Sequence, residues 1–241
     1  MNSHAESVPT PAAEGAGPSP AGTFLDTLFS PRAAFREIRR DPHWLLPLLF
    51  FTAATFVHTV VALPFTMARI ADQIRSMNPS LNGAALDRAA ETPRFMVGTV
   101  SLLSSVLTPL LIVLVTAGLA HLLAVLLKGD LDARGRAAFS ASAHACLPLA
   151  LGALARVPLI LREKTLEVSL GLDAVMPGLA QGGSARFFQF FDGFRLWFAV
   201  LLAVAVAGIY RLPAWKAAVV SIAVNAVWFG FFVLMTGAWN L

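Results

Sequence analysis

The chain has 241 residues, of which 57% are hydrophobic and only 13% are charged, and its mean hydropathy is +0.70. Soluble domains carry about a quarter charged residues, so this composition excludes an ordinary soluble domain and indicates an integral membrane protein. The formal net charge is +4, but the basic residues lie between apolar runs, where they orient a membrane protein, and we expect no nucleic-acid partner. Cys146 is the only cysteine, which excludes an intrachain disulfide, and we expect neither a cofactor nor a metal.

Residues 1–22 form the first predicted segment and are rich in Pro, Ala and Gly. Such a segment cannot bury enough apolar surface to fold, so we expect a disordered tail. It lacks a basic stretch followed by an apolar stretch, and we therefore expect no cleavable signal peptide.

Residues 23–41 follow, with apolar and basic residues at helical spacing. Ser30-Pro31 is typical of a helix start, and Arg40-Asp41-Pro42 is typical of a helix end. A helix of this pattern lies in the membrane interface, with its apolar side toward lipid and its basic side toward anionic headgroups. We expect one amphipathic interfacial helix, which acts as an anchor or, in a sharper interpretation, senses lipid or a partner. Its candidate contact residues are Phe29, Pro31, Arg32, Phe35, Arg36, Ile38, Arg39 and Arg40.

Residues 42–241 contain five charge-poor runs. The most distinctive is 95–127, which has no Asp, Glu, Lys or Arg, whereas about 20 apolar residues already cross a bilayer core. The predicted fold is all-α, a polytopic membrane bundle of five transmembrane helices. Between the first two spans, we expect short helices at 65–75 and 84–88, interrupted by Pro79 and Gly83. The predicted spans are about 44–67, 96–127, 137–160, 192–210 and 215–239.

Basic residues near the ends of the spans predict the orientation of the chain. They are dense before the first span, between the second and third spans, and in the tight turn between the fourth and fifth spans. Five spans place these three regions on one side of the membrane, and positive residues favour the cytoplasm. We therefore expect the N-terminus in the cytoplasm and the C-terminus outside.

Few polar side chains lie inside the predicted spans. His121 and His144 fall at similar depth in neighbouring antiparallel spans, so the two imidazoles could meet and bind a metal or relay protons. Two imidazoles without a carboxylate or thiolate make a poor metal site, and we favour structural hydrogen bonds. Asn225, one turn after Ser221, is expected to hydrogen-bond between helices.

Two features concern the start and the face of the fourth span. Asp192 and Arg195 share one face of the predicted helix, and we interpret them as an ion pair at the membrane interface. Alanine recurs every fourth residue from Ala199 to Ala207, which permits close contact with the fifth span. Formation of a homo-oligomer through the same face stays open.

Three segments resemble a known family. They are the stretch containing Phe29, Pro31, Phe35, Ile38, Pro42, Trp44 and Pro47, the stretch 140–149 with Leu147-Pro148, and Asp192-Gly-Phe-Arg-Leu-Trp197. In order and spacing they resemble bacterial-type members of the Yip family, small membrane proteins with a cytosolic N-terminus and five spans. The resemblance covers 23–235 and implies a bacterial cytoplasmic membrane. Eukaryotic members bind Rab-type GTPases, but their Asp-Leu-Tyr-Gly-Pro and Gly-Tyr motifs are missing here.

No hydrolase, zincin, P-loop or dinucleotide-binding motif is found, so we do not expect an enzyme. The favoured function is a non-enzymatic membrane protein that organises the membrane or recruits a protein partner at the cytoplasmic face. The alternative is a small transporter or channel component with a polar path through spans two, three and five, formed by His121, His144 and Asn225.

Overall fold

The structure, a computed structural model, describes residues 19–130, 135–166, 168, 170–171 and 190–237. Over these residues the fold is all-α and has no named strand, which confirms the predicted fold class. Residues 1–18 of the predicted tail and most of the loop before the fourth span lie outside the described residues. The helices are α1 (Pro20–Phe29), α2 (Pro31–Arg40), α3 (Leu45–Met77), α4 (Gly83–Leu126), α5 (Gly135–Ala145), α6 (Leu147–Glu163), α9 (Gly193–Tyr210) and α10 (Ala214–Gly237).

Five segments are long and apolar enough to cross a membrane: α3, α4, the pair α5 and α6, α9 and α10. Each of them overlaps one of the predicted spans. Their outward faces carry large apolar side chains, such as Ile222 and Leu234 of α10, which are each 68% exposed. A soluble protein rarely exposes so much contiguous apolar surface, so these faces fit a lipid environment.

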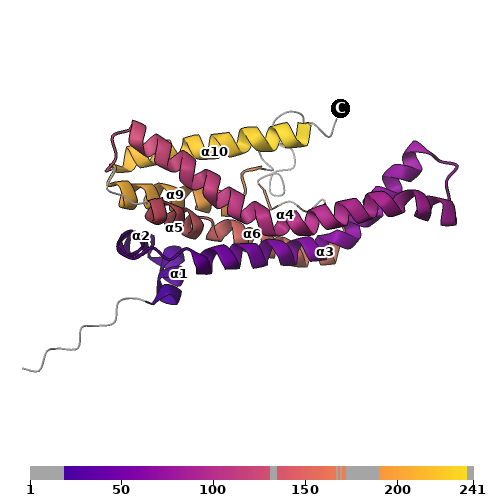
Figure 1. Ribbon diagram of the computed structural model, residues 1–241, viewed down its shortest axis with the longest axis horizontal. Coiled ribbons are helices and arrows are strands. Elements are labelled where there is room, and N and C mark those ends of the chain that lie inside the picture. The colour runs from indigo at the N-terminus through magenta and orange to yellow at the C-terminus, as the bar shows by residue number, and fades with distance from the viewer. Residues whose placement is uncertain (1–18, 131–134, 167, 169, 172–189, 238–241) are drawn as a thin grey trace, which may run out of the picture.

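The first two spans are longer than predicted. α3 runs without interruption to Met77 and α4 starts at Gly83, so the separate short helices expected at 65–75 and 84–88 are instead the ends of these spans. At 1.5 Å per residue, the 44 residues of α4 measure about 66 Å. The α3–α4 hairpin therefore projects well beyond the other helices at the right of Figure 1. Pro93 and Pro109 lie inside α4 without ending it.

The third span is divided into α5 and α6 at Cys146. Pro148 has no N–H to donate to the carbonyl of His144, so the regular helical ladder cannot continue through this position. The Cys146 N–H still bonds to the Ser142 carbonyl at 3.1 Å, and the Leu149 N–H turns back to the Cys146 carbonyl at 3.0 Å. Pro148 thus starts α6 in its first turn.

The N-terminal segment differs from the single interfacial helix predicted over 23–41. The structure has two helices, α1 and α2, separated at Ser30, whose φ of −136° and ψ of 55° are not helical. The proline at position 31 causes the break, because it disfavours a helical conformation in the residue before it. α1 and α2 lie at one end of the bundle, at the left of Figure 1.

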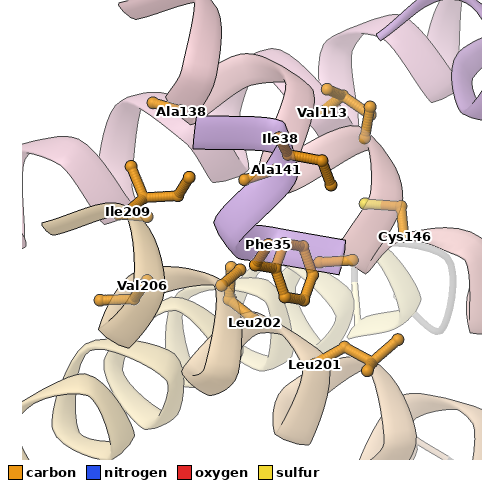
Figure 2. Close-up of a cluster of buried hydrophobic side chains, with 14 of the residues drawn as sticks. Phe35, Ile38, Val113, Ala138, Ala141, Cys146, Leu201, Leu202, Val206 and Ile209 are labelled. Atoms are coloured by element: carbon orange, nitrogen blue, oxygen red, sulfur yellow. The ribbon is translucent and has the colours of Figure 1, made fainter. Parts of the chain in front are cut away.

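The direction of the apolar face of α2 also corrects the prediction. Phe35 and Ile38 are fully buried, and Figure 2 shows them pointing into a cluster of side chains from α4, α5, α9 and the α5–α6 junction. This face is therefore covered by protein, whereas the prediction had it facing lipid. The labelled neighbours are Val113, Ala138, Ala141, Cys146, Leu201, Leu202, Val206 and Ile209.

Candidate functional site

Three basic regions of the sequence meet at one end of the bundle. Asp130, in the link after α4, accepts a hydrogen bond from the guanidinium of Arg39 at 2.8 Å and lies 3.6 Å from that of Arg211. The Asp130 N–H donates to the Tyr210 carbonyl at 2.9 Å, and Lys216 Nζ donates to the Leu127 carbonyl at 2.9 Å. These contacts confirm that the N-terminal segment, the α4–α5 link and the α9–α10 turn share one side. We call this side the basic end.

The predicted contact residues of α2 divide into two groups. Phe35 and Ile38 are buried, and Arg39 is held by Asp130, so these three fix the helix on the bundle. The side chains that stay accessible are Phe29, which is 82% exposed, and the exposed Arg32, Arg36 and Arg40, with Pro31 partly covered at the first helical position. The backbone of a docked helix has a fixed position relative to the bundle, unlike that of a free segment. α2 therefore presents a fixed basic surface.

A cavity of about 600 Å³ lies between α2 and α9 at the basic end. Arg32 and Arg36 line it on one side. No ion pair joins either arginine to a carboxylate among the residues the structure describes. The opposite wall is made of small or apolar residues, Ala203, Val204, Ala207 and Gly208 of α9 and Ala214 of α10.

The two span histidines have separate partners. His121 Nδ1 lies 3.1 Å from the Tyr210 hydroxyl, and the fully buried His144 has its Nδ1 2.9 Å from the carbonyl of Ser140 in its own helix. No hydrogen bond between the two imidazoles occurs in the described part of the chain. That part also contains no group of three or more His, Cys, Asp or Glu side chains suited to a metal.

The hydrogen bond between α9 and α10 is made by Ser221. Its Oγ donates to the Ala199 carbonyl at 2.6 Å, whereas Asn225 Nδ2 donates to the Ser221 carbonyl of its own helix at 2.9 Å. The interhelical bond expected of Asn225 thus belongs to its neighbour one turn earlier. Asn225, His121 and His144 occupy separate contacts, and nothing in these contacts joins the three side chains into one polar path.

At the start of the fourth span, Asp192 and Arg195 do not form the predicted side-chain ion pair but make other contacts. Asp192 is the N-cap of α9, and its Oδ1 accepts from the backbone N–H of Arg195 at 2.7 Å. Its Oδ2 accepts from Arg156 of α6 at 2.8 Å. The Arg195 guanidinium lies 3.9 Å from the centroid of the Phe190 ring, a cation–π distance. Asp192 therefore fastens α9 to α6 at the end opposite the basic end.

Sequence reasoning missed Asp130, Arg156 and Tyr210. Two of them carry a recognisable pattern: Arg156 is a charged residue inside a predicted span, where charges are rare and have partners, and Asp130 is one of two acids, with Asp132, among the basic residues of its link. Tyr210 gave no such indication, because a tyrosine at a span end is typical of any membrane interface.

A comparison with protein families shows which family the chain belongs to. The family model of the Yip1 domain matches residues 25–236, which is most of the chain and includes all five spans. The chain belongs to the Yip1 domain family. No curated protein and no solved structure matches it. The matched region of this Yip1-domain protein begins within α1, so it includes the end of α1 and all of α2.

Proposed function

We propose that this Yip1-domain protein is non-enzymatic and acts at the cytoplasmic face of a bacterial cytoplasmic membrane, where it organises the membrane or recruits a protein partner. The observation that supports the proposal is the docking of α2, whose buried Phe35 and paired Arg39 hold it on the bundle while Arg32, Arg36 and Arg40 stay exposed.

A docked helix favours binding for an entropic reason. A free segment loses conformational freedom when it binds, at a cost of roughly 1–2 kcal/mol for each residue that becomes ordered. The backbone of α2 has already lost that freedom in the folded bundle, so contacts to its exposed side carry no further cost of backbone ordering. Exposed Phe29, at the end of α1, adds an apolar contact beside this basic surface.

Positive residues on this side support the cytoplasmic placement. Arg32, Arg36, Arg39 and Arg40 precede the first span. Lys128 and Arg211 lie in the two connections at the same end, and Lys216 lies in the first turn of α10. Basic residues in short segments near span ends are retained in the cytoplasm during insertion. A negatively charged inner leaflet or an acidic partner would complement this end of the protein.

Site-specific photocrosslinking in native membranes tests the proposal. A photoreactive residue at the exposed position 29 should give a discrete adduct with one partner protein, or an enriched lipid adduct. The matched control at the buried position 35 should give crosslinks only within the chain, to neighbouring helices such as α9. Identical adducts from both positions, or a random mixture of abundant proteins at position 29, would contradict the proposal.

A further inference from the structure

We infer that the cavity between α2 and α9 binds one anionic phospholipid. Its phosphate would contact Arg32 and Arg36, and the first segments of its acyl chains would lie along α9. The inference deepens the proposed function and rests on it for the placement of α2 at a leaflet surface. Its test below contains no protein partner, so the two proposals fail separately.

The charge of the cavity favours an anion. Arg32 and Arg36 lie one helical turn apart on α2, and Arg36 Nε donates to the Arg32 carbonyl at 3.3 Å. This bond directs the Arg36 side chain toward the N-terminus of α2 and uses only its Nε, so the two terminal nitrogens of the guanidinium do not take part in it. The guanidinium group matches phosphate oxygens in a two-bond geometry, which makes two neighbouring arginines a suitable phosphate clamp.

The position of the arginines on α2 also favours an anion. The first turn of α2 contains no acidic residue, and Ser30 makes no side-chain capping bond. A helix N-terminus carries a partial positive charge, so Arg32 in this turn is unfavourable when nothing negative is nearby. A phosphate at this point would offset both the helix dipole and the two guanidinium charges. Arg39, by contrast, already has Asp130.

The opposite wall of the cavity suits an acyl chain. Ala203, Ala207 and Gly208 lack large side chains, and together with Val204 they leave a smooth strip on α9. Ala203 lies eight positions before Arg211, so the strip extends about 12 Å inward from the end of the helix. Val200, just beyond the strip, is 59% exposed, and Trp215 at the interface is 65% exposed, so the strip continues into a lipid-facing surface.

The size of the cavity agrees with this occupant. A volume of about 600 Å³ exceeds what one phosphate fills and lies in the range of sites for small organic ligands. It accommodates a glycerophosphate group with the first segments of its chains. A zwitterionic lipid is a poorer match, because its choline group would bring a positive charge back to two arginines that lack a carboxylate partner among the described residues.

The test measures lipids retained by the purified full-length protein, by native mass spectrometry after reconstitution in equal amounts of phosphatidylglycerol and phosphatidylcholine. The wild type should retain phosphatidylglycerol preferentially. The double variant R32Q/R36Q should retain at least about tenfold less, because it removes both charged donors to the phosphate. Arg40→Gln removes one positive charge from an exposed site outside the cavity and should change retention less than about twofold.

A second variant separates a lipid from a soluble anion. Ala207→Leu fills the apolar strip without changing any charge, and Ala203→Val is the milder substitute if the leucine variant does not fold. Either should lower phosphatidylglycerol retention while leaving binding of inorganic phosphate unchanged. Equal losses in R32Q/R36Q and R40Q would overturn the site. Retention that is abolished by millimolar inorganic phosphate but unaffected by both strip variants would overturn the lipid as its occupant.

Discussion

Gly208 of α9 lies directly against Phe35 of α2: a Cβ atom on this glycine would lie 3.4 Å from the Phe35 Cβ. The two residues are far apart in the sequence, and their approach places α2 on the bundle. The absence of a side chain at position 208 lets the helix come close enough to bury the Phe35 ring completely.

Substitutions at Gly208 should therefore show a threshold in size. Gly208→Ala should be tolerated or stabilise the fold by up to about 1 kcal/mol, because 3.4 Å is an ordinary contact and alanine favours a helix over glycine. Gly208→Leu should displace α2 and increase protease cleavage at Arg39 and Arg40. The measurement is limited proteolysis in membranes, and equal cleavage of the two variants would contradict the prediction.

The Arg39–Asp130 pair should contribute measurably to stability. Both side chains are 21% exposed, so solvent screens the pair only in part, and we expect a coupling energy of about 1 kcal/mol. A double-mutant cycle with Arg39→Gln and Asp130→Asn, followed by unfolding in SDS, measures it. The control is the pair Asp72–Arg75, whose side chains are 71% and 58% exposed and whose coupling should be below about 0.5 kcal/mol. Equal coupling in the two pairs would count against the role of Asp130.

Two substitutions at Asp192 should separate its two contacts. Asp192→Asn keeps a good N-cap for α9 but removes the charge that faces Arg156, and we expect a loss of about 1–2 kcal/mol in the free energy of unfolding. Asp192→Ala removes the cap as well, which costs about 1 kcal/mol more. If Asn and Ala variants unfold identically, the capping bond contributes nothing.

The proposed orientation predicts opposite labelling of the two ends. In a Cys146→Ala background, a cysteine at Ser80, in the α3–α4 turn, should react with a membrane-impermeant thiol reagent in intact cells. A cysteine at Arg40 should react only after the membrane is permeabilised. In the unsubstituted protein, the buried Cys146 should react neither in intact nor in permeabilised cells. Labelling of Arg40→Cys in intact cells would show that the protein has the opposite orientation.

The fold was largely predictable from the sequence because a bilayer imposes a length on each apolar run. The positions of all five spans follow from that single constraint. The positions where α3 ends and α4 begins could not be predicted in this way. The bilayer constrains only the part of a helix that lies inside it, whereas α3 continues to Met77 and α4 starts at Gly83 in polar sequence.

The site was only partly predictable, because a sequence pattern shows which face of a helix is apolar but not whether lipid or protein covers that face. The spacing of Phe35 and Ile38 shows that one side of α2 must be covered, and it fits lipid and protein equally well. Likewise, the three-residue spacing of Asp192 and Arg195 fits an ion pair and an N-cap equally well. The pairing of Arg39 with Asp130 joins residues 91 positions apart, and no local pattern encodes such a contact.

The docking of α2 on α9 is the central claim, and a disulfide tests it most directly. In a Cys146→Ala background, the double variant Phe35→Cys/Gly208→Cys should form an intrachain disulfide when native membranes are mildly oxidised. A Cβ separation near 3.4 Å is close to the roughly 3.5–4.5 Å that disulfides require. The control Phe29→Cys/Gly208→Cys, with its first cysteine on the exposed end of α1, should stay reduced. A reduced Phe35→Cys/Gly208→Cys protein would instead mean that α2 leaves the bundle and lies on the lipid.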